Sequence, residues 1–356
     1  MIINRYLIRE MALPLVTVTA VLVVIFMSYN AVRYTADAAA GLLPGSTVLQ
    51  LTLLRSLIAI EVLLPVALYL SVVMGMGRLY SDNEMVALYA NGFSELRVVR
   101  SVLWLSLAVA IVVASLSLAV RPWAYYKSYL LKAEAEAEFN LDKLEAGQFY
   151  SAEESGTVIF VERINRVEKR LEQVYFFKIN DKSVGIISAR QAWQPVTDPF
   201  ASPVLKFIDG NEYLVDLTGS RDLTLKFKQL SLLLKDNDEE LERHRSKATG
   251  TLKLARSSNP DDLAEFQWRL TTPFTTLLLG VLGVPLSRSA PRRGRYSKTM
   301  VAALFFAFFY NFNVMAKNWV EQGVVGAIPG VWWPQVLLGF LIIALLFLPI
   351  LRSRVR

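Results

Sequence analysis

The chain has 356 residues, of which 54% are hydrophobic and 19% are charged, and its formal net charge is +7. Together with a mean hydropathy of +0.38, these values exclude a wholly soluble protein, because one soluble core cannot hold so much apolar sequence. The chain contains no cysteine, which excludes disulfides, thiol catalysis and cysteine-based metal sites.

Six long apolar stretches account for most of this hydropathy. A helix needs roughly 20 apolar residues to cross the hydrocarbon core of a bilayer. Stretches of this kind occupy residues 11–32, 50–76, 98–120, 270–287, 299–317 and 332–351. They lack period-two alternation, so they are predicted to be helices and not barrel strands. The first is too long for the apolar region of a signal peptide, and we expect it to be a retained span.

Basic residues are distributed unevenly around these spans. They flank the N-terminus, the second and fourth loops and the C-terminus: Arg5, Arg9, Arg78, Arg97, Arg100, Arg288, Arg292, Arg293, Arg295, Lys298, Arg352, Arg354 and Arg356. The first and fifth loops contain neither Lys nor Arg. The positive-inside rule therefore predicts that both termini are cytoplasmic. The positive net charge is a topology signal, and nothing supports nucleic-acid binding.

The segment 121–265 differs in composition from the spans and has the size of a domain. VIFVERI, LEQVYFFKI and LTLKF are predicted strands, and Asp209-Gly210 is predicted to be a hairpin turn. Several short strands indicate a jellyroll or sandwich. A helix through LLKAEAEAEFNLD precedes the strands, and Asn259-Pro260 is typical of the start of the next helix.

The predicted fold is thus an α+β membrane protein, with six transmembrane helices and an extracytoplasmic β-domain inserted between spans three and four. The domain boundaries are 1–120 for the first three spans, 121–265 for the β-domain with flanking helices, and 266–356 for the last three spans.

The sequence offers no catalytic constellation. His244 is the only histidine, and no glycine is followed by lysine, which excludes a P-loop. We therefore expect no catalytic residue, cofactor or metal site, and any ATP hydrolysis would belong to a partner chain.

The second loop contains a short amphipathic helix near 81–91, within RLYSDNEMVALYANGFSEL. Ser81 and Glu84 have the spacing of a capping box, and Asn91-Gly92 is a stop signal. Apolar surface would come from Met85, Val86, Leu88 and Tyr89. A defined helix in a short cytoplasmic turn predicts a docking element for a soluble partner.

Charged residues inside the spans are a further candidate site. A charge at mid-bilayer costs about 2.5–3.5 kcal/mol or more, so it usually faces a partner or a cavity. Arg33, Arg55 and Lys317 are predicted to face the outer leaflet and to hold an anionic lipid; Glu61 lies deeper. Snorkelling to headgroups is the alternative for the cations, and ion or proton transport is the alternative for the group.

Three classes of function remain open from the residues alone: an ABC permease subunit, a secondary transporter and a membrane sensor. The docking helix favours the first. A secondary transporter should show internal repeats, and a sensor needs a cytoplasmic output domain longer than any inner loop of this chain.

Several motifs resemble one family. MIINRYLIRE, GRLYSDNEMVALYANGFS, AGQFY, WRLTTPFTTLLLGVLGVPLS and PRRGR are similar to the LptF/LptG permeases of the lipopolysaccharide export ABC transporter, and more to its LptF branch. The resemblance implies a bacterial inner-membrane heterodimer with LptG, driven by two copies of the ATPase LptB. Lipopolysaccharide would be extracted from the outer leaflet and passed through a periplasmic jellyroll toward LptC and LptA.

The resemblance also implies roles for particular residues. Glu84 would be the acidic residue of the coupling helix, and ATPase coupling would involve Tyr80, Glu84, Met85 and Leu88. The three cations would lie around the lipid cavity. Within the β-domain, consecutive apolar residues and the jellyroll likeness predict an acyl-chain groove formed by Phe160, Tyr175, Phe177, Leu225 and Phe227.

Overall fold

The computed structural model describes residues 2–39, 44–142, 146–152, 157–165, 170–180, 183–193, 204–216, 223–233, 238–288 and 297–354. The chain forms two compact units. One comprises Met1–Arg33, Leu49–Ser128 and Arg243–Arg356, and the other comprises Tyr34–Val48 and Tyr129–Glu242. These boundaries differ from the predicted 121 and 265, because the residues that lead into and out of the β-domain pack with the spans.

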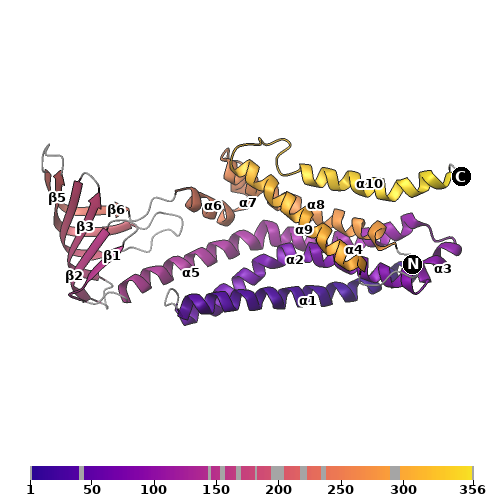
Figure 1. Ribbon diagram of the computed structural model, residues 1–356, viewed down its shortest axis with the longest axis horizontal. Helices are drawn as coiled ribbons and strands as arrows, with labels where there is room; N and C mark the ends of the chain where they lie inside the picture. Colours follow the sequence, from indigo (N-terminus) through magenta and orange to yellow (C-terminus); the bar gives the residue numbers. More distant parts are fainter. Residues whose placement is uncertain are drawn as a thin grey trace. The chain divides into compact units, whose positions relative to one another are not determined.

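The helices appear in Figure 1. Their bounds are α1 Ile2–Ala39, α2 Gly45–Ser81, α3 Glu84–Ala90, α4 Glu95–Ser115, α5 Arg121–Asp142, α6 Asp238–Ala248, α7 Thr251–Leu254, α8 Pro260–Ser287, α9 Ser297–Glu321 and α10 Trp333–Arg354. A π-helical segment, η1 (Leu116–Val120), joins α4 to α5 without a break. The predicted helix after the third span is therefore confirmed.

Five of the described helices are long and apolar enough to cross a membrane: α1, α2, the continuous α4–η1–α5 helix, α8 and α9. The described part of α10 adds a shorter apolar stretch, Trp333–Leu346. The first five predicted spans lie within these helices, and the sixth, 332–351, lies within α10 except for its first residue. Asn259 caps α8 as predicted, since its side chain accepts a hydrogen bond from the backbone N–H of Asp261.

Two glycines allow α8 to approach its neighbours closely. A Cβ on Gly280 would collide with the Ser106 side chain of α4, and one on Gly283 would lie 2.7 Å from Val72 Cγ1 of α2. Leu68, Val72, Met76 and Val284 belong to a buried cluster that also includes α1, α3 and α4 residues. This packing fixes α8 against α2 and α4.

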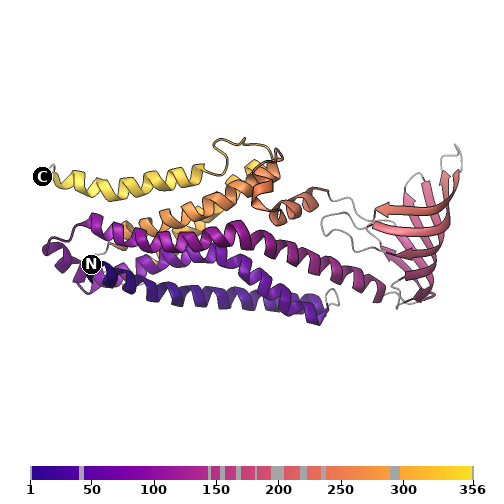
Figure 2. The same cartoon turned by 180° about the vertical axis from the view of Figure 1, so that it is seen from behind.

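The second unit contains one six-stranded antiparallel sheet whose strand order follows the sequence. The strands are β1 Phe149–Ala152, β2 Thr157–Asn165, β3 Arg170–Asn180, β4 Ser183–Trp193, β5 Val204–Asp216 and β6 Leu223–Leu233. The sheet is strongly curved (Figure 2). One face buries a cluster that includes Val161, Val174, Phe176 and Phe207. The predicted fold class is confirmed, although the described strands form one curved sheet and not two stacked ones.

The predicted hairpin at Asp209-Gly210 is wrong. Strand β5 runs through this dipeptide, and its register with β4 and β6 is the same on both sides of Asp209, which has a φ of 48°. A Cβ on Gly210 would collide with the Ser188 carbonyl and lie 2.6 Å from the Phe227 ring. Asp-Gly suits this strand as well as a turn, because Asp tolerates a left-handed φ and Gly permits a close backbone approach.

Candidate functional site

The loop helix α3 lies between α2 and α4 and begins at Glu84. Its N-cap is Asn83, with φ of 61° and no side-chain capping bond, so the predicted Ser81–Glu84 capping box is wrong. Ser81 is still part of α2, which leaves no room for it to cap the next helix. The predicted stop is confirmed: Gly92 has φ of 79°, and the Asn91 amide donates to the Ala87 carbonyl at 2.8 Å.

One side of α3 is attached to the spans. Met85 is fully buried in the cluster that contains Leu79 and Phe93. The hydroxyls of Tyr80 and Tyr89 are 3.0 Å apart, and burial together with this hydrogen bond raises the pKa of Tyr89. These contacts attach α3 to α2 and to the buried cluster of the helical unit.

The other side of α3 is exposed among the described residues. Val86 is 56% exposed, Ala87 and Ala90 are also exposed, and Leu96 at the start of α4 is 72% exposed. Of the residues predicted to contact a partner, Met85 is buried and Tyr80 and Leu88 are half-buried. Val86 on α3 and Leu96 at the start of α4 are the large apolar side chains that these described segments leave exposed, and we call the two together the α3 face.

Glu84 is the acidic group of this helix, and it is half-buried. Its Oε2 accepts a hydrogen bond from the Tyr6 hydroxyl of α1 at 2.5 Å. Nearby, Arg78 Nη2 lies 2.9 Å from Glu10 Oε2, and Arg288 at the end of α8 forms an ion pair with Glu95 at the start of α4. These contacts connect α1, α2, α4 and α8 around α3.

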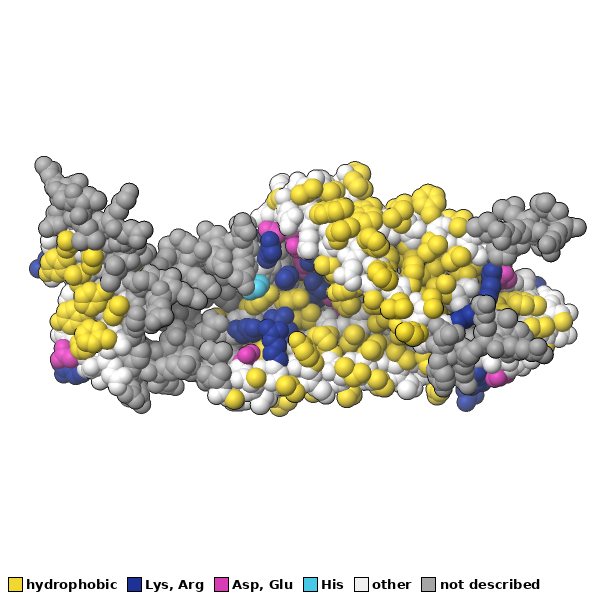
Figure 3. All heavy atoms as spheres, viewed as in Figure 1, with side chains coloured by type: hydrophobic (Ala, Val, Ile, Leu, Met, Phe, Trp, Pro, Cys, Tyr) yellow, Lys and Arg dark blue, Asp and Glu magenta, His cyan; other side chains and the backbone are white. Residues whose placement is uncertain are grey.

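The three predicted lipid-binding cations have different surroundings. Arg33 is exposed on α1. Arg55 is half-buried, with its guanidinium 5.5 Å from the centre of the Tyr125 ring. Lys317 is buried, its Nζ lies 2.6 Å from Glu265 Oε2, and it stands 5.3 Å from the centre of a Trp268 ring. Figure 3 shows Lys and Arg side chains gathered within the helical unit, flanked by broad apolar surface.

Lys317 is one member of a buried group of five charged side chains that we call the Glu265 cluster: Glu61, Arg121, Glu265, Arg269 and Lys317. None is more than 8% exposed. Arg121 bridges the two carboxylates, with Nη1 2.9 Å from Glu61 Oε2 and Nε 2.8 Å from Glu265 Oε1. Arg269 Nε adds a contact of 3.1 Å to Glu265 Oε1.

Sequence reasoning identified Glu61 and Lys317 but missed the other three members. One signal was present: Glu265 and Arg269 are one helical turn apart on α8, where opposite charges can pair. Arg121 carried no comparable signal, because its partners lie 60 and 144 residues away in the sequence.

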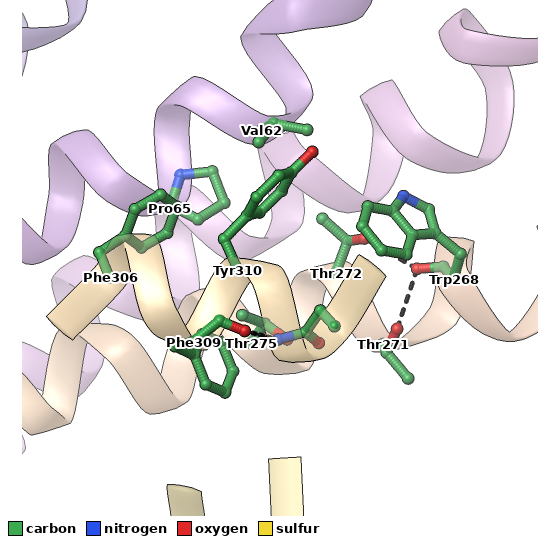
Figure 4. A pocket seen from close by; sticks show the side chains of 10 residues that line it. Val62, Pro65, Trp268, Thr271, Thr272, Thr275, Phe306, Phe309 and Tyr310 are labelled. Carbon is green, nitrogen blue, oxygen red and sulfur yellow. Dashed lines mark hydrogen bonds between the residues drawn. The ribbon is translucent and has the colours of Figure 1, made fainter. Parts of the chain in front are cut away.

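Between α2, α8 and α9, beside this cluster, lies a small cavity of about 40 Å³ (Figure 4). Its lining is Val62, Pro65, Trp268, Thr271, Thr272, Thr275, Phe306, Phe309, Tyr310 and Asn313. The Trp268 indole N–H is buried and has no hydrogen-bond partner among the described residues. The cavity has room for water but not for a lipid chain.

The predicted acyl-groove residues do not share one face of the sheet. Phe227 belongs to the buried cluster, and Leu225 is 44% exposed. Phe160 and Tyr175 are cross-strand partners, whereas their neighbours Val161 and Val174 point into the cluster. Phe160 and Tyr175 therefore lie on the opposite face, as does Phe177, which is two residues from Tyr175.

That opposite face carries its own aromatic row. The ring centres of Phe149 and Phe160 are 4.6 Å apart, and those of Phe160 and Tyr175 are 6.1 Å apart. The sheet thus offers apolar side chains on both faces, and an acyl chain on one face would contact only part of the predicted set.

The described features define a multi-pass membrane protein with a short helix between two spans and an inserted antiparallel β-domain. The family model described as "Lipopolysaccharide export system permease LptF/LptG" matches residues 5–347. The chain belongs to this family, and it is an inner-membrane permease. The resemblance read from the sequence motifs is confirmed.

Two relatives are similar over almost the whole chain. The lipopolysaccharide export system permease protein LptF of Escherichia coli (strain K12) is 27% identical over 358 residues, which cover 97% of this chain and 94% of the relative. The LptF protein of Shigella flexneri matches with the same identity and coverage.

Proposed function

We propose that this chain is a permease subunit of an ATP-driven ABC transporter, which extracts lipopolysaccharide from the outer leaflet of the inner membrane and passes it to a periplasmic bridge. The observation that carries the ATP-driven part is α3. A seven-residue helix is attached through Met85 and presents Val86 outward, an arrangement that can transmit force from a soluble subunit to the spans.

The proposed partners are a homologous LptG permease, two copies of the ATPase LptB, LptC and the bridge protein LptA. In this arrangement both termini and α3 are cytoplasmic, and the β-sheet is periplasmic. Helix α1 supports the pairing with a second permease, since only 6% of its apolar window is buried within this chain. Helix α9 is similar, with 22% of its window buried.

Lipid phosphates are proposed to bind near Arg33 and Arg55, through charge-assisted hydrogen bonds. Lys317 is proposed to join them only after it leaves Glu265, because its ammonium is already neutralised by that carboxylate. In the β-domain, acyl chains are proposed to contact either the Phe227 face or the face that holds Phe160, Tyr175 and Phe177.

Copurification tests the proposal. A tagged chain, expressed in its own host and extracted in mild detergent, should retain an ATPase subunit. Val86→Asp places a charge on the α3 face and should lose that subunit, whereas Val324→Asp, at an even more exposed position after α9, should keep it. A secondary transporter or a sensor would purify without any ATPase.

A further inference from the structure

The Glu265 cluster joins more than neighbouring spans. Glu61 lies on α2, Arg121 is the first residue of α5, Glu265 and Arg269 lie on α8, and Lys317 lies near the end of α9. The three cationic side chains form buried ion pairs with the two carboxylates. Glu321 is a further partner, 3.6 Å from Lys317. Glu265 is the centre, because it contacts all three cations.

On one side, Glu265 holds the connection that leads toward the β-sheet. The Arg121 guanidinium donates from Nε and Nη2 to the two Glu265 oxygens, at 2.8 and 3.4 Å. Arg121 follows directly on the π-helical segment η1, where Ser117 Oγ donates to Glu61 at 2.8 Å. Single π turns inside α-helices often mark functional sites, since the extra residue redirects side chains.

On its other side, Glu265 orients Arg269, which binds the end of α6, where the chain returns to the spans. Arg269 donates to the carbonyls of Lys247 and Thr249, each at 2.9 Å, and to Ser246 at 3.3 Å. It also donates to Thr251 Oγ1 at 2.9 Å. These acceptors form the C-terminal end of α6 and the start of α7, so a fully buried arginine caps the helix through which the chain returns to the spans.

We propose that Glu265 is a positioning residue of transport: through Arg121 and Arg269 it holds the start of α5 and the end of α6, the two connections between the spans and the β-sheet, in one arrangement with α2 and α9. The transport part of this inference rests on the proposed function. The mechanical part concerns the helical unit alone.

The buried charges of the Glu265 cluster favour a role in fixing the geometry of the connections, which we call a joint, over a role in stability alone. A buried ion group of this kind costs desolvation, and an apolar replacement of the same volume often stabilises a protein as well or better. Directional ion pairs instead fix the helices that they join in one relative geometry. Lys317 has a second carboxylate, Glu321, on its own helix, so it can exchange its contact with Glu265 while the two arginines keep theirs.

Spin labels can test the mechanical part, because the chain has no cysteine. Labels are placed at Lys127→Cys on α5 and Leu252→Cys on α7; Lys127 is exposed, and Leu252 is 84% exposed. The distance distribution is measured by pulsed electron resonance in the full chain, assembled in its complex. We expect one narrow distance with Glu265 intact and a distribution about twofold broader or more in Glu265→Gln, as for a segment that has lost its local anchor.

Two further variants complete the comparison. Glu321→Gln removes a carboxylate from the edge of the cluster and should leave the distribution narrow. Arg269→Lys keeps the charge but loses the multiple carbonyl contacts, and it should broaden the distribution even if Glu265→Gln fails to assemble. A distribution that stays narrow in Arg269→Lys, and in Glu265→Gln where that variant assembles, would overturn the inference.

The transport part is measured as lipopolysaccharide released per ATP hydrolysed in proteoliposomes. Glu265→Gln should lower this ratio about tenfold or more, because an unpaired buried charge is strongly destabilising to the coupled geometry, while Glu321→Gln should leave it unchanged. An unchanged ratio in a Glu265→Gln complex with a broadened distribution would overturn the coupling role. If the unsubstituted complex released no lipopolysaccharide, the proposed function would fail, and the spin-label comparison would still decide the mechanical part.

Discussion

The Tyr6 hydroxyl donates to Glu84 Oε2 at 2.5 Å, although the two residues are 78 positions apart. This contact attaches the first helix of the chain to the acidic group of α3. It also supplies a second explanation for the importance of Glu84: the carboxylate accepts a hydrogen bond within its own chain and does not need an ATPase to be useful.

Substitutions at these two residues separate the explanations. Tyr6→Phe removes the hydrogen bond and should cost about 1 kcal/mol of stability, with ATPase association unchanged. Glu84→Gln keeps an oxygen for Tyr6 but loses the charge, and it should weaken association by about tenfold or more if the carboxylate meets a basic groove of the ATPase. Binding of purified ATPase to each variant in nanodiscs is the measurement. Equal affinity of Glu84→Gln and the unsubstituted chain would leave Glu84 with a structural role only.

Helix packing makes a second prediction. Gly280→Ala should destabilise the helical unit by about 1–3 kcal/mol, because the new Cβ would overlap the Ser106 side chain of α4. Gly339→Ala on α10 is the matched control, since nothing lies within 4 Å of its added Cβ. Thermal unfolding in detergent compares the two, and equal melting temperatures would contradict the close approach of α8 and α4.

Lipid binding makes a third prediction. Charge reversal should reduce export more than truncation at the proposed phosphate positions, because a carboxylate repels the phosphate that alanine merely fails to attract. Arg33 is the cleanest site, since its side chain is exposed. Lys317→Glu is expected to disturb assembly as well, because it would place another carboxylate beside Glu265. Normal export by Arg33→Glu and Arg55→Glu at normal expression would make those arginines headgroup anchors.

The two faces of the β-sheet can be compared by photocrosslinking. A reactive amino acid at Leu225 or Phe227 samples one face, and one at Phe160, Tyr175 or Phe177 samples the other. We expect lipopolysaccharide adducts that require ATP on one face only, because an acyl chain needs a continuous apolar surface. The absence of adducts from both faces during active export would reduce the sheet to a spacer.

Topology is tested with single cysteines, which have no background here. Ser46→Cys, exposed near the start of α2, and Ser220→Cys, which lies outside the described residues, should react with an impermeant reagent added to intact spheroplasts. Ser297→Cys at the start of α9 should be protected. The reverse pattern would invert the proposed orientation.

Local sequence signals predicted much of the fold. Apolar length identified the spans, alternation identified β6, and short apolar runs identified β2 and β3, because these patterns report burial within one element. These sequence signals gave the wrong prediction where the same residues suit two different local structures. Asp209-Gly210 suits both a turn and a strand with one left-handed residue, and Ser81 is a good cap only if α2 stops before it.

The candidate site was less accessible to prediction. Glu84 could be singled out from its loop, but Tyr6 could not be recognised as its partner, and Met85 could not be assigned to the buried side of so short a helix. The contacts of Glu265 with Arg121 and Lys317 span 144 and 52 residues. Pairings of this kind depend on how the spans pack, which no local pattern encodes.

The most direct test of the central claim is ATP-driven release of lipopolysaccharide from proteoliposomes that contain this chain with its partner permease and the ATPase. Release to an added bridge protein is followed over time with ATP and with a nonhydrolysable analogue. We predict release only with hydrolysable ATP, and its loss when Val86→Asp disrupts the α3 face. Release that proceeds equally with the analogue, or that survives Val86→Asp, would contradict a permease driven through α3.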